Sequence, residues 1–150
     1  MLASRPVLMN THWVVEIDAR EEIMIVRRTA NAYANVGEVR AAFEEVRRIV
    51  DGLDRPNFSV FIDMRLAPPR DDPEFERAAI DQPKTLSHGF KRSAVVMRTA
   101  IGILHVQRNL SRLGVPIKVF NDEQPAIEYL RGRSEPQSVN VTGPPTKRGL

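Results

Sequence analysis

Cysteine is absent from this chain of 150 residues. Its absence excludes disulfides, thiol nucleophiles, cysteine-ligated zinc and iron–sulfur clusters. No apolar stretch approaches the roughly 18 residues that a membrane span needs. Pro6 interrupts the N-terminal segment, and no apolar run of signal-peptide length follows it. We therefore expect a cytoplasmic protein with no membrane insertion.

The common catalytic motifs are absent as well. The glycines are scattered, so none begins a dinucleotide-binding fingerprint or a P-loop. No grouping of serine, histidine and acid has the spacing of a nucleophile elbow. His12, His88 and His105 lack metal-ligand spacing and are expected on the surface. The sequence predicts no catalytic residue, no metal site and no cofactor.

The positive charge is confined to one end of the chain. The formal net charge is +3, and residues 131–150 carry all of it, because basic and acidic side chains balance over residues 1–130. The basic pI therefore describes the C-terminal segment rather than the folded part. A neutral folded part offers no electrostatic reason to bind nucleic acid, so we expect no nucleic-acid partner.

Alternating strand and helix patterns predict an α/β fold. Apolar, β-branched runs predict strands over residues 13–17, 23–26, 58–62, 91–97 and 117–120. Apolar spacings of three and four, with capping residues, predict helices over residues 35–52, 72–86, 99–113 and 122–131. In the second of these, Pro83 is expected to bend or end the helix. The order is β-β-α-β-α-β-α-β-α. The first two strands form an antiparallel hairpin and the rest pair in parallel, giving a mixed sheet of about five strands with four helices.

The same patterns set the expected boundaries. Residues 1–11 are expected to form an N-terminal extension and residues 12–132 the domain. Residues 133–150 are rich in proline and poor in apolar side chains, so their ordering entropy would not be repaid by burial. We expect them to be a disordered basic tail.

One cluster of residues has the position of a binding site. Asp63 ends the central strand, and Arg65 and Arg70 lie in the proline-rich loop after it. Ligands of parallel sheets bind beyond the carboxyl ends of the strands. Thr99 and Gly102 begin the next long helix, whose amides can hold an anion. Two structural alternatives remain open: Asp63 can pair with an arginine, and Gly102 can allow close packing of the helix.

Three segments together resemble the STAS superfamily, in particular its SpoIIAA-like (STAS/SEC14-type) bacterial domains. The first is Phe58–Asp63 with the loop and acidic helix after it; the second is Phe90–Val96 with the helix to Leu113; the third is Pro116–Glu123 leading into Ala126–Leu130. The likeness covers about residues 12–131. It implies a SpoIIAA-like fold and a non-catalytic regulatory module that binds proteins, as anti-sigma factor antagonists do.

The chain departs from that family at the regulatory position. Antagonists carry a phosphorylated serine or threonine at the helix after the central strand, whereas no serine or threonine lies between Val60 and Lys84 here. We expect a protein-interaction module that contacts its partner through Asp63, Arg65, Arg70, Thr99 and Gly102. The alternatives are a protein that binds a small apolar ligand, an unrecognised enzyme that uses a cleft near Asp63, and self-association through a sheet edge.

Overall fold

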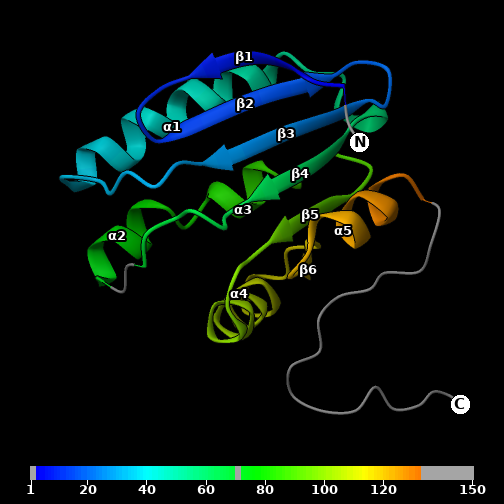
Figure 1. Cartoon of the computed structure of the whole chain (residues 1–150). Coiled ribbons are helices and arrows are strands. Elements are labelled where there is room, and N and C mark those ends of the chain that lie inside the picture. Colours follow the sequence, from blue (N-terminus) through cyan, green and yellow to red (C-terminus); the bar gives the residue numbers. More distant parts are fainter. Residues whose placement is uncertain (1–2, 70–71, 133–150) are drawn as a thin grey trace, which may run out of the picture.

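A mixed sheet forms the centre of the molecule (Figure 1). The computed structural model describes residues 3–69 and 72–132. Its six strands lie in chain order. They are β1 (Arg5–Met9), β2 (Trp13–Asp18), β3 (Ile23–Arg28), β4 (Ser59–Asp63), β5 (Ser93–Val96) and β6 (Lys118–Phe120). The strands β1, β2 and β3 pair antiparallel, and β3 to β6 pair in parallel.

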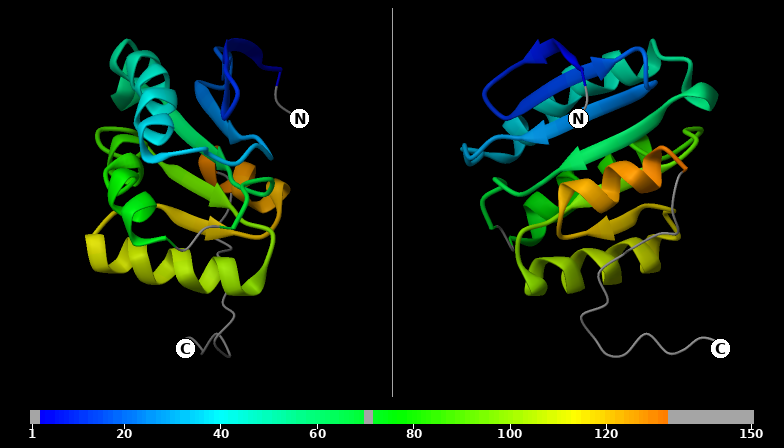
Figure 2. Two further views of the ribbon diagram at one scale, coloured as in Figure 1. Left: turned by 90° about the vertical axis from the view of Figure 1, so that its left-hand side faces the viewer. Right: turned by 45° about the vertical axis from the view of Figure 1, so that its right-hand side comes forward.

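Helices cover the two faces of the sheet unequally (Figure 2). They are α1 (Val36–Asp51), α2 (Pro73–Ala78), α3 (Gln82–Thr85), α4 (Ala100–Leu113) and α5 (Glu123–Leu130), with a short 3₁₀ turn η1 (Arg55–Asn57). The helices α1, α3 and α4 lie on one side and α5 lies alone on the other. The molecule therefore has three layers, with most of its helical mass on the α1 side.

The pleat of β3 explains why there are two cores. Met24 and Val26 point into the core beneath α1 and α4, whereas Ile23 and Ile25 point into the core beneath α5. All four side chains are at most 1% exposed. Successive side chains of a strand point to opposite faces, so a continuous apolar run needs cover on both faces.

The helix α1 follows from its sequence pattern. Val39, Phe43, Val46 and Val50 form its buried stripe. At its start, the side chain of Asn35 accepts a hydrogen bond from the Glu38 amide at 3.0 Å. The observed bounds agree with the predicted helix over residues 35–52, and α4 and α5 likewise occupy predicted positions.

Two parts of the prediction need correction. Residues 5–9, expected to lie in an extension before the domain, form the edge strand β1, so the sheet has six strands rather than five. Most of β1 is exposed and Pro6 interrupts its pattern, so the pairing with β2 decides its conformation. The helix predicted over residues 72–86, with a bend or end at Pro83, is interrupted before that proline, between Ala78 and Gln82, giving α2 and α3. The predicted tail, residues 133–150, lies outside the described residues.

Among the described residues, no helix combines the length and the apolar character that crossing a bilayer requires.

Two glycines at helix ends give a test of this backbone. Gly114 ends α4 with φ of 68° and has nothing within 4 Å of an added Cβ, so only its left-handed backbone opposes alanine. We expect Gly114→Ala to lower the free energy of unfolding by about 1 kcal/mol. Gly52 ends α1 with φ of −91° and has room for a Cβ. Gly52→Ala should be neutral or stabilising by about 0.5 kcal/mol in urea denaturation; equal effects of the two changes would contradict this backbone.

Candidate functional site

Asp63 lies between two arginines at the carboxyl edge of the sheet. It is opposite Arg27 in the register of β3 and β4. Arg27 Nη1 donates to Asp63 Oδ2 at 2.7 Å. Arg65 donates from Nε to Oδ1 and from Nη2 to Oδ2, both at 2.9 Å. The backbone N–H of Arg65 also donates to Oδ1 at 3.1 Å. Both carboxylate oxygens are therefore engaged.

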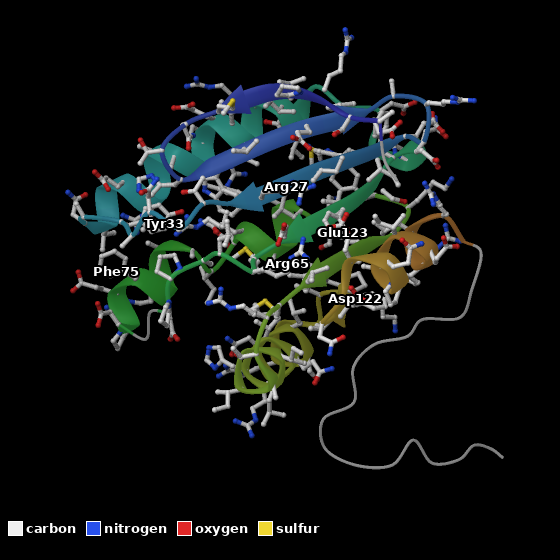
Figure 3. The ribbon with its side chains drawn as sticks, in the orientation of Figure 1. Arg27, Tyr33, Arg65, Phe75, Asp122 and Glu123 are labelled. Carbon is white, nitrogen blue, oxygen red and sulfur yellow. The ribbon has the colours of Figure 1, made fainter. Side chains whose placement is uncertain are left out.

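This ion-pair network extends across the sheet to α5. Arg65 Nη2 also donates to Glu123 Oε1 at 2.9 Å, where α5 begins. Arg27 Nε lies 3.8 Å from Glu16 Oε1 on β2. Figure 3 shows Arg27, Arg65 and Glu123 converging on this face. The network thus connects β2, β3, β4 and the start of α5.

The network keeps Asp63 ionised. Burial alone would raise the pKa of its carboxyl, but the hydrogen bonds from Arg65 and Arg27 outweigh burial and hold the pKa below its ordinary value. The hydrogen bond to Asp63 in turn raises the pKa of Arg65. Asp63 therefore has the arginine pairing that the sequence left open as the structural alternative.

Thr99 and Gly102 have a local role at the start of α4. The Thr99 hydroxyl accepts the Gly102 N–H at 3.0 Å and so caps the helix. A Cβ at Gly102 would lie only 2.9 Å from that hydroxyl oxygen. Glycine therefore permits the close approach of the cap. No described contact joins these two residues to Asp63, and Arg70 lies outside the described residues.

A pocket lies on the opposite face of the sheet, among helices. Its volume is about 630 Å³. Its wall comes from β2, the end of β3, the segment before α1, the loop after β4, and helices α1 to α4. The lining includes Trp13, Arg28, Tyr33, Pro68, Pro73, Phe75, Ile80 and Pro83. Asp63, Arg65, Thr99 and Gly102 are not among its lining residues. In Figure 3, Tyr33 and Phe75 lie at the α2 end of the molecule, away from Arg65 and Glu123.

A cluster of aromatic rings around Arg28 forms one wall of the pocket. The Arg28 guanidinium carbon lies 4.6 Å from the centre of the Tyr33 ring and 5.6 Å from that of Trp13. His12 stacks on Tyr33 with ring centres 4.3 Å apart. His12 is only 6% exposed, so the expectation that it lies on the surface is wrong. It is buried because the Tyr33 segment folds over it.

Arg28 also organises the segment between β3 and α1. Its Nη1 donates to the carbonyl oxygens of His12 and Thr29, both at 3.0 Å. Its Nη1 and Nη2 lie 3.4 and 3.3 Å from the Asn31 carbonyl oxygen. Burial lowers the pKa of Arg28, although a guanidinium stays charged at neutral pH.

The sequence did not predict Trp13, Arg28 or Tyr33 as functional, although it held a signal for two of them. Alternation along β3 places Arg28 on the same face as Met24 and Val26, and alternation along β2 places Trp13 with Val15. A charged residue in register with a buried stripe is unusual. The other lining residues meet only through tertiary folding.

Within residues 3–69 and 72–132, no three histidine, aspartate or glutamate side chains are grouped so as to hold a metal ion.

Comparison with known proteins identifies no relative: no protein-family model, curated protein or solved structure matches the chain. The resemblance to SpoIIAA-like STAS domains therefore stays a prediction. What the structure gives is an α/β fold with a six-stranded mixed sheet.

Replacing the central carboxylate tests the ion-pair network. We expect Asp63→Asn to lower the free energy of unfolding at pH 7 by about 2 kcal/mol, because hydrogen bonds to a charged group are lost. The folded-state pKa of Asp63 lies below that of the unfolded chain. Its contribution is therefore present above about pH 4 and is lost as the pH falls through the lowered value. The difference between variant and parent should shrink at pH 3.

The matched control for this measurement is Asp51→Asn. Asp51 pairs with Arg55 at 2.8 Å on the surface, with 60% of its side chain exposed. Such a pair contributes at most about 1 kcal/mol. Urea denaturation at both pH values gives the comparison. A loss at Asp63 no larger than that at Asp51, or one unchanged at pH 3, would show that the network does not stabilise the fold as described.

Proposed function

We propose that the chain is a non-catalytic binding protein that holds a small ligand with an apolar body in the pocket among α1, α2 and α4. The observation that carries this proposal is the pocket itself, at about 630 Å³. Pockets for small molecules have volumes of about 300–1,000 Å³ and are mostly apolar with a few polar groups. The pocket has both properties.

The wall of the pocket suits a flat or aliphatic body. Trp13, Tyr33 and Phe75 provide aromatic faces, and three prolines provide rigid apolar edges. Trp13 is held in place by Phe43, whose ring meets it edge to face with centres 5.6 Å apart. A wall that is fixed before binding costs the ligand little ordering entropy.

The cleft near Asp63 gives less support to the enzyme alternative. A general base must accept a proton near neutral pH. The Asp63 carboxylate has both oxygens engaged by arginines and a lowered pKa. It is consequently a weak base, and we propose no reaction there.

A regulatory role is consistent with the helices of the pocket wall. The helices α2 and α3 are six and four residues long. Helices of that length are not stable by themselves in water, so their packing decides their structure. A bound ligand that contacts Phe75, Ile80 and Pro83 would stabilise both helices. A partner protein that contacts the outer surface of α2 would then bind the ligand-bound and ligand-free forms with different affinities.

A neutral fluorescent probe tests the pocket. Trp13 is the only tryptophan in the chain and lines the pocket. We expect N-phenyl-1-naphthylamine to quench Trp13 emission in a saturable titration. Ala79→Phe places a ring in the wall and should weaken binding about tenfold, equivalent to about 1.4 kcal/mol. Ala41→Phe, on the exposed surface of α1, should leave the affinity within twofold.

Two results would count against the pocket. One is an absence of quenching by the probe together with native mass spectra in which the purified protein carries no ligand. The other is binding weakened equally by the changes at Ala79 and Ala41, which would place the probe elsewhere.

Protein interaction through the loop after β4 is a second candidate. Leu66 lies beside Arg65 in that loop and is 58% exposed. Exposed apolar side chains in a loop at the strand ends suit a contact surface. We expect Leu66→Asp to abolish cross-linking of the full chain to a native partner in lysate. Ile101→Asp, at a site 82% exposed on α4, is the control. Equal cross-linking by both variants would exclude this surface.

A further inference from the structure

The charged residues of the pocket wall are mostly positive. Arg28, Arg77 and Arg112 line the pocket, whereas Glu76 is the lining carboxylate among the described residues. Arg77, Arg112 and Glu76 are exposed and lie at the rim, and Arg28 is 6% exposed and lies in the wall. A positive wall attracts a ligand of opposite charge.

Arg28 differs in its partners from Arg27, Arg65 and Arg131, which are half-buried. Arg27 pairs with Asp63, Arg65 with Asp63 and Glu123, and Arg131 with Glu21. Arg28 forms no ion pair with a described carboxylate; its partners are backbone carbonyls and aromatic rings. Buried charges in proteins are normally paired. The positive charge of Arg28 is therefore left without a counter-charge at the pocket wall.

One donor accompanies this charge. The Arg28 Nε makes no described hydrogen bond and is not among the fully buried nitrogens. Burial raises the pKa of the neighbouring Tyr33 hydroxyl, whereas the Arg28 charge and a hydrogen bond from the Trp13 indole act against burial. The Trp13 N–H is therefore engaged with Tyr33, and Arg28 Nε is the donor that a ligand can meet. A carboxylate supplies only acceptors.

We infer that the ligand of this pocket carries a carboxylate, which binds the guanidinium of Arg28 while its apolar body packs against Phe75 and the neighbouring prolines. The inference rests on the proposed ligand-binding function and specifies its ligand class: an aliphatic or aromatic monocarboxylic acid. A planar guanidinium binds a carboxylate through charge-assisted hydrogen bonds, which are about twice as strong as neutral ones.

The experiment compares two ligands that share a body and differ in charge. 1-Naphthaleneacetate is an anion at pH 7, and 1-naphthaleneacetamide is neutral. Each is used to displace N-phenyl-1-naphthylamine from the full chain. We expect the acid to act at about tenfold lower concentration than the amide, the factor that one charge-assisted interaction provides. Equal concentrations for acid and amide would overturn the inference.

Variants assign the preference to Arg28. In Arg28→Gln the ratio between amide and acid should fall to about twofold, whereas the exposed, non-lining Arg40→Gln should keep it. A ratio that survives Arg28→Gln, or one that is lost instead in the rim variant Arg112→Gln, would overturn the assignment.

If neither the probe nor either naphthalene compound binds, the proposed function itself fails. If the probe and the amide bind and the acid has no advantage, only the carboxylate inference fails.

A measurement on the unaltered protein covers the case in which Arg28→Gln does not fold. The chain has one tryptophan, so its indole N–H gives one proton–nitrogen NMR signal. The Arg28 guanidinium carbon lies 5.6 Å from the centre of the Trp13 ring, so a carboxylate bound to Arg28 should move this signal further than the amide does. Identical positions with saturating acid and saturating amide would contradict the inference.

Discussion

The structure depends on a constraint at β3, which is buried on both faces and ends in two arginines. Its pleat sends Arg27 to the α5 face and Arg28 to the α1 face. The Arg28 guanidinium is buried at the end of a strand whose preceding residues are almost fully covered, whereas the Arg27 side chain is 33% exposed. Each of the two charges is stabilised by a different set of neighbours. On one face this is the network centred on Asp63, and on the other it is a set of carbonyls and rings.

The different surroundings of Arg27 and Arg28 have different consequences for binding. On the α5 face, two arginines share one carboxylate and reach Glu16 and Glu123, so every charge has an opposite partner. Such a network stabilises the edge of the sheet, and both oxygens of its central carboxylate are engaged. On the α1 face, carbonyl dipoles solvate the Arg28 charge without neutralising it. The site with less complete internal pairing is the better candidate for binding.

Sequence patterns predicted the helices and strands whose conformation is determined by their own local sequence. The helix α1 carries a regular buried stripe and an Asn35 cap, and β4 is a continuous apolar run that ends at Asp63. The strand β1 could not be predicted in this way, because it is mostly exposed and its pairing with β2 places it. The break between α2 and α3 comes shortly before Pro83, which lies in the first turn of α3.

The sequence predicted contact residues at the carboxyl edge of the sheet, and the structure has Asp63 and Arg65 there, on the face opposite the pocket. The position of Asp63 at a strand end was read correctly, but only the structure shows that Arg27, distant in sequence, completes its pairing. Conversely, Arg28 is buried on the other face of the sheet. Its burial follows from Tyr33, which comes from the irregular segment before α1 and covers it. No local pattern encodes that approach.

The segment before α1 links the pocket to the rest of the fold. Arg28 holds the carbonyls of Thr29 and Asn31, and three residues later the Ala34 N–H donates to Glu38 Oε1 at 2.8 Å in the first turn of α1. An anion on the free Nε of Arg28 would leave these carbonyl contacts intact, because the Nη1 and Nη2 groups make them. The ligand would therefore add a partner to Arg28 without removing one. Its charge would lower the cost of burying the guanidinium, so that binding and the order of the Tyr33 segment would stabilise each other.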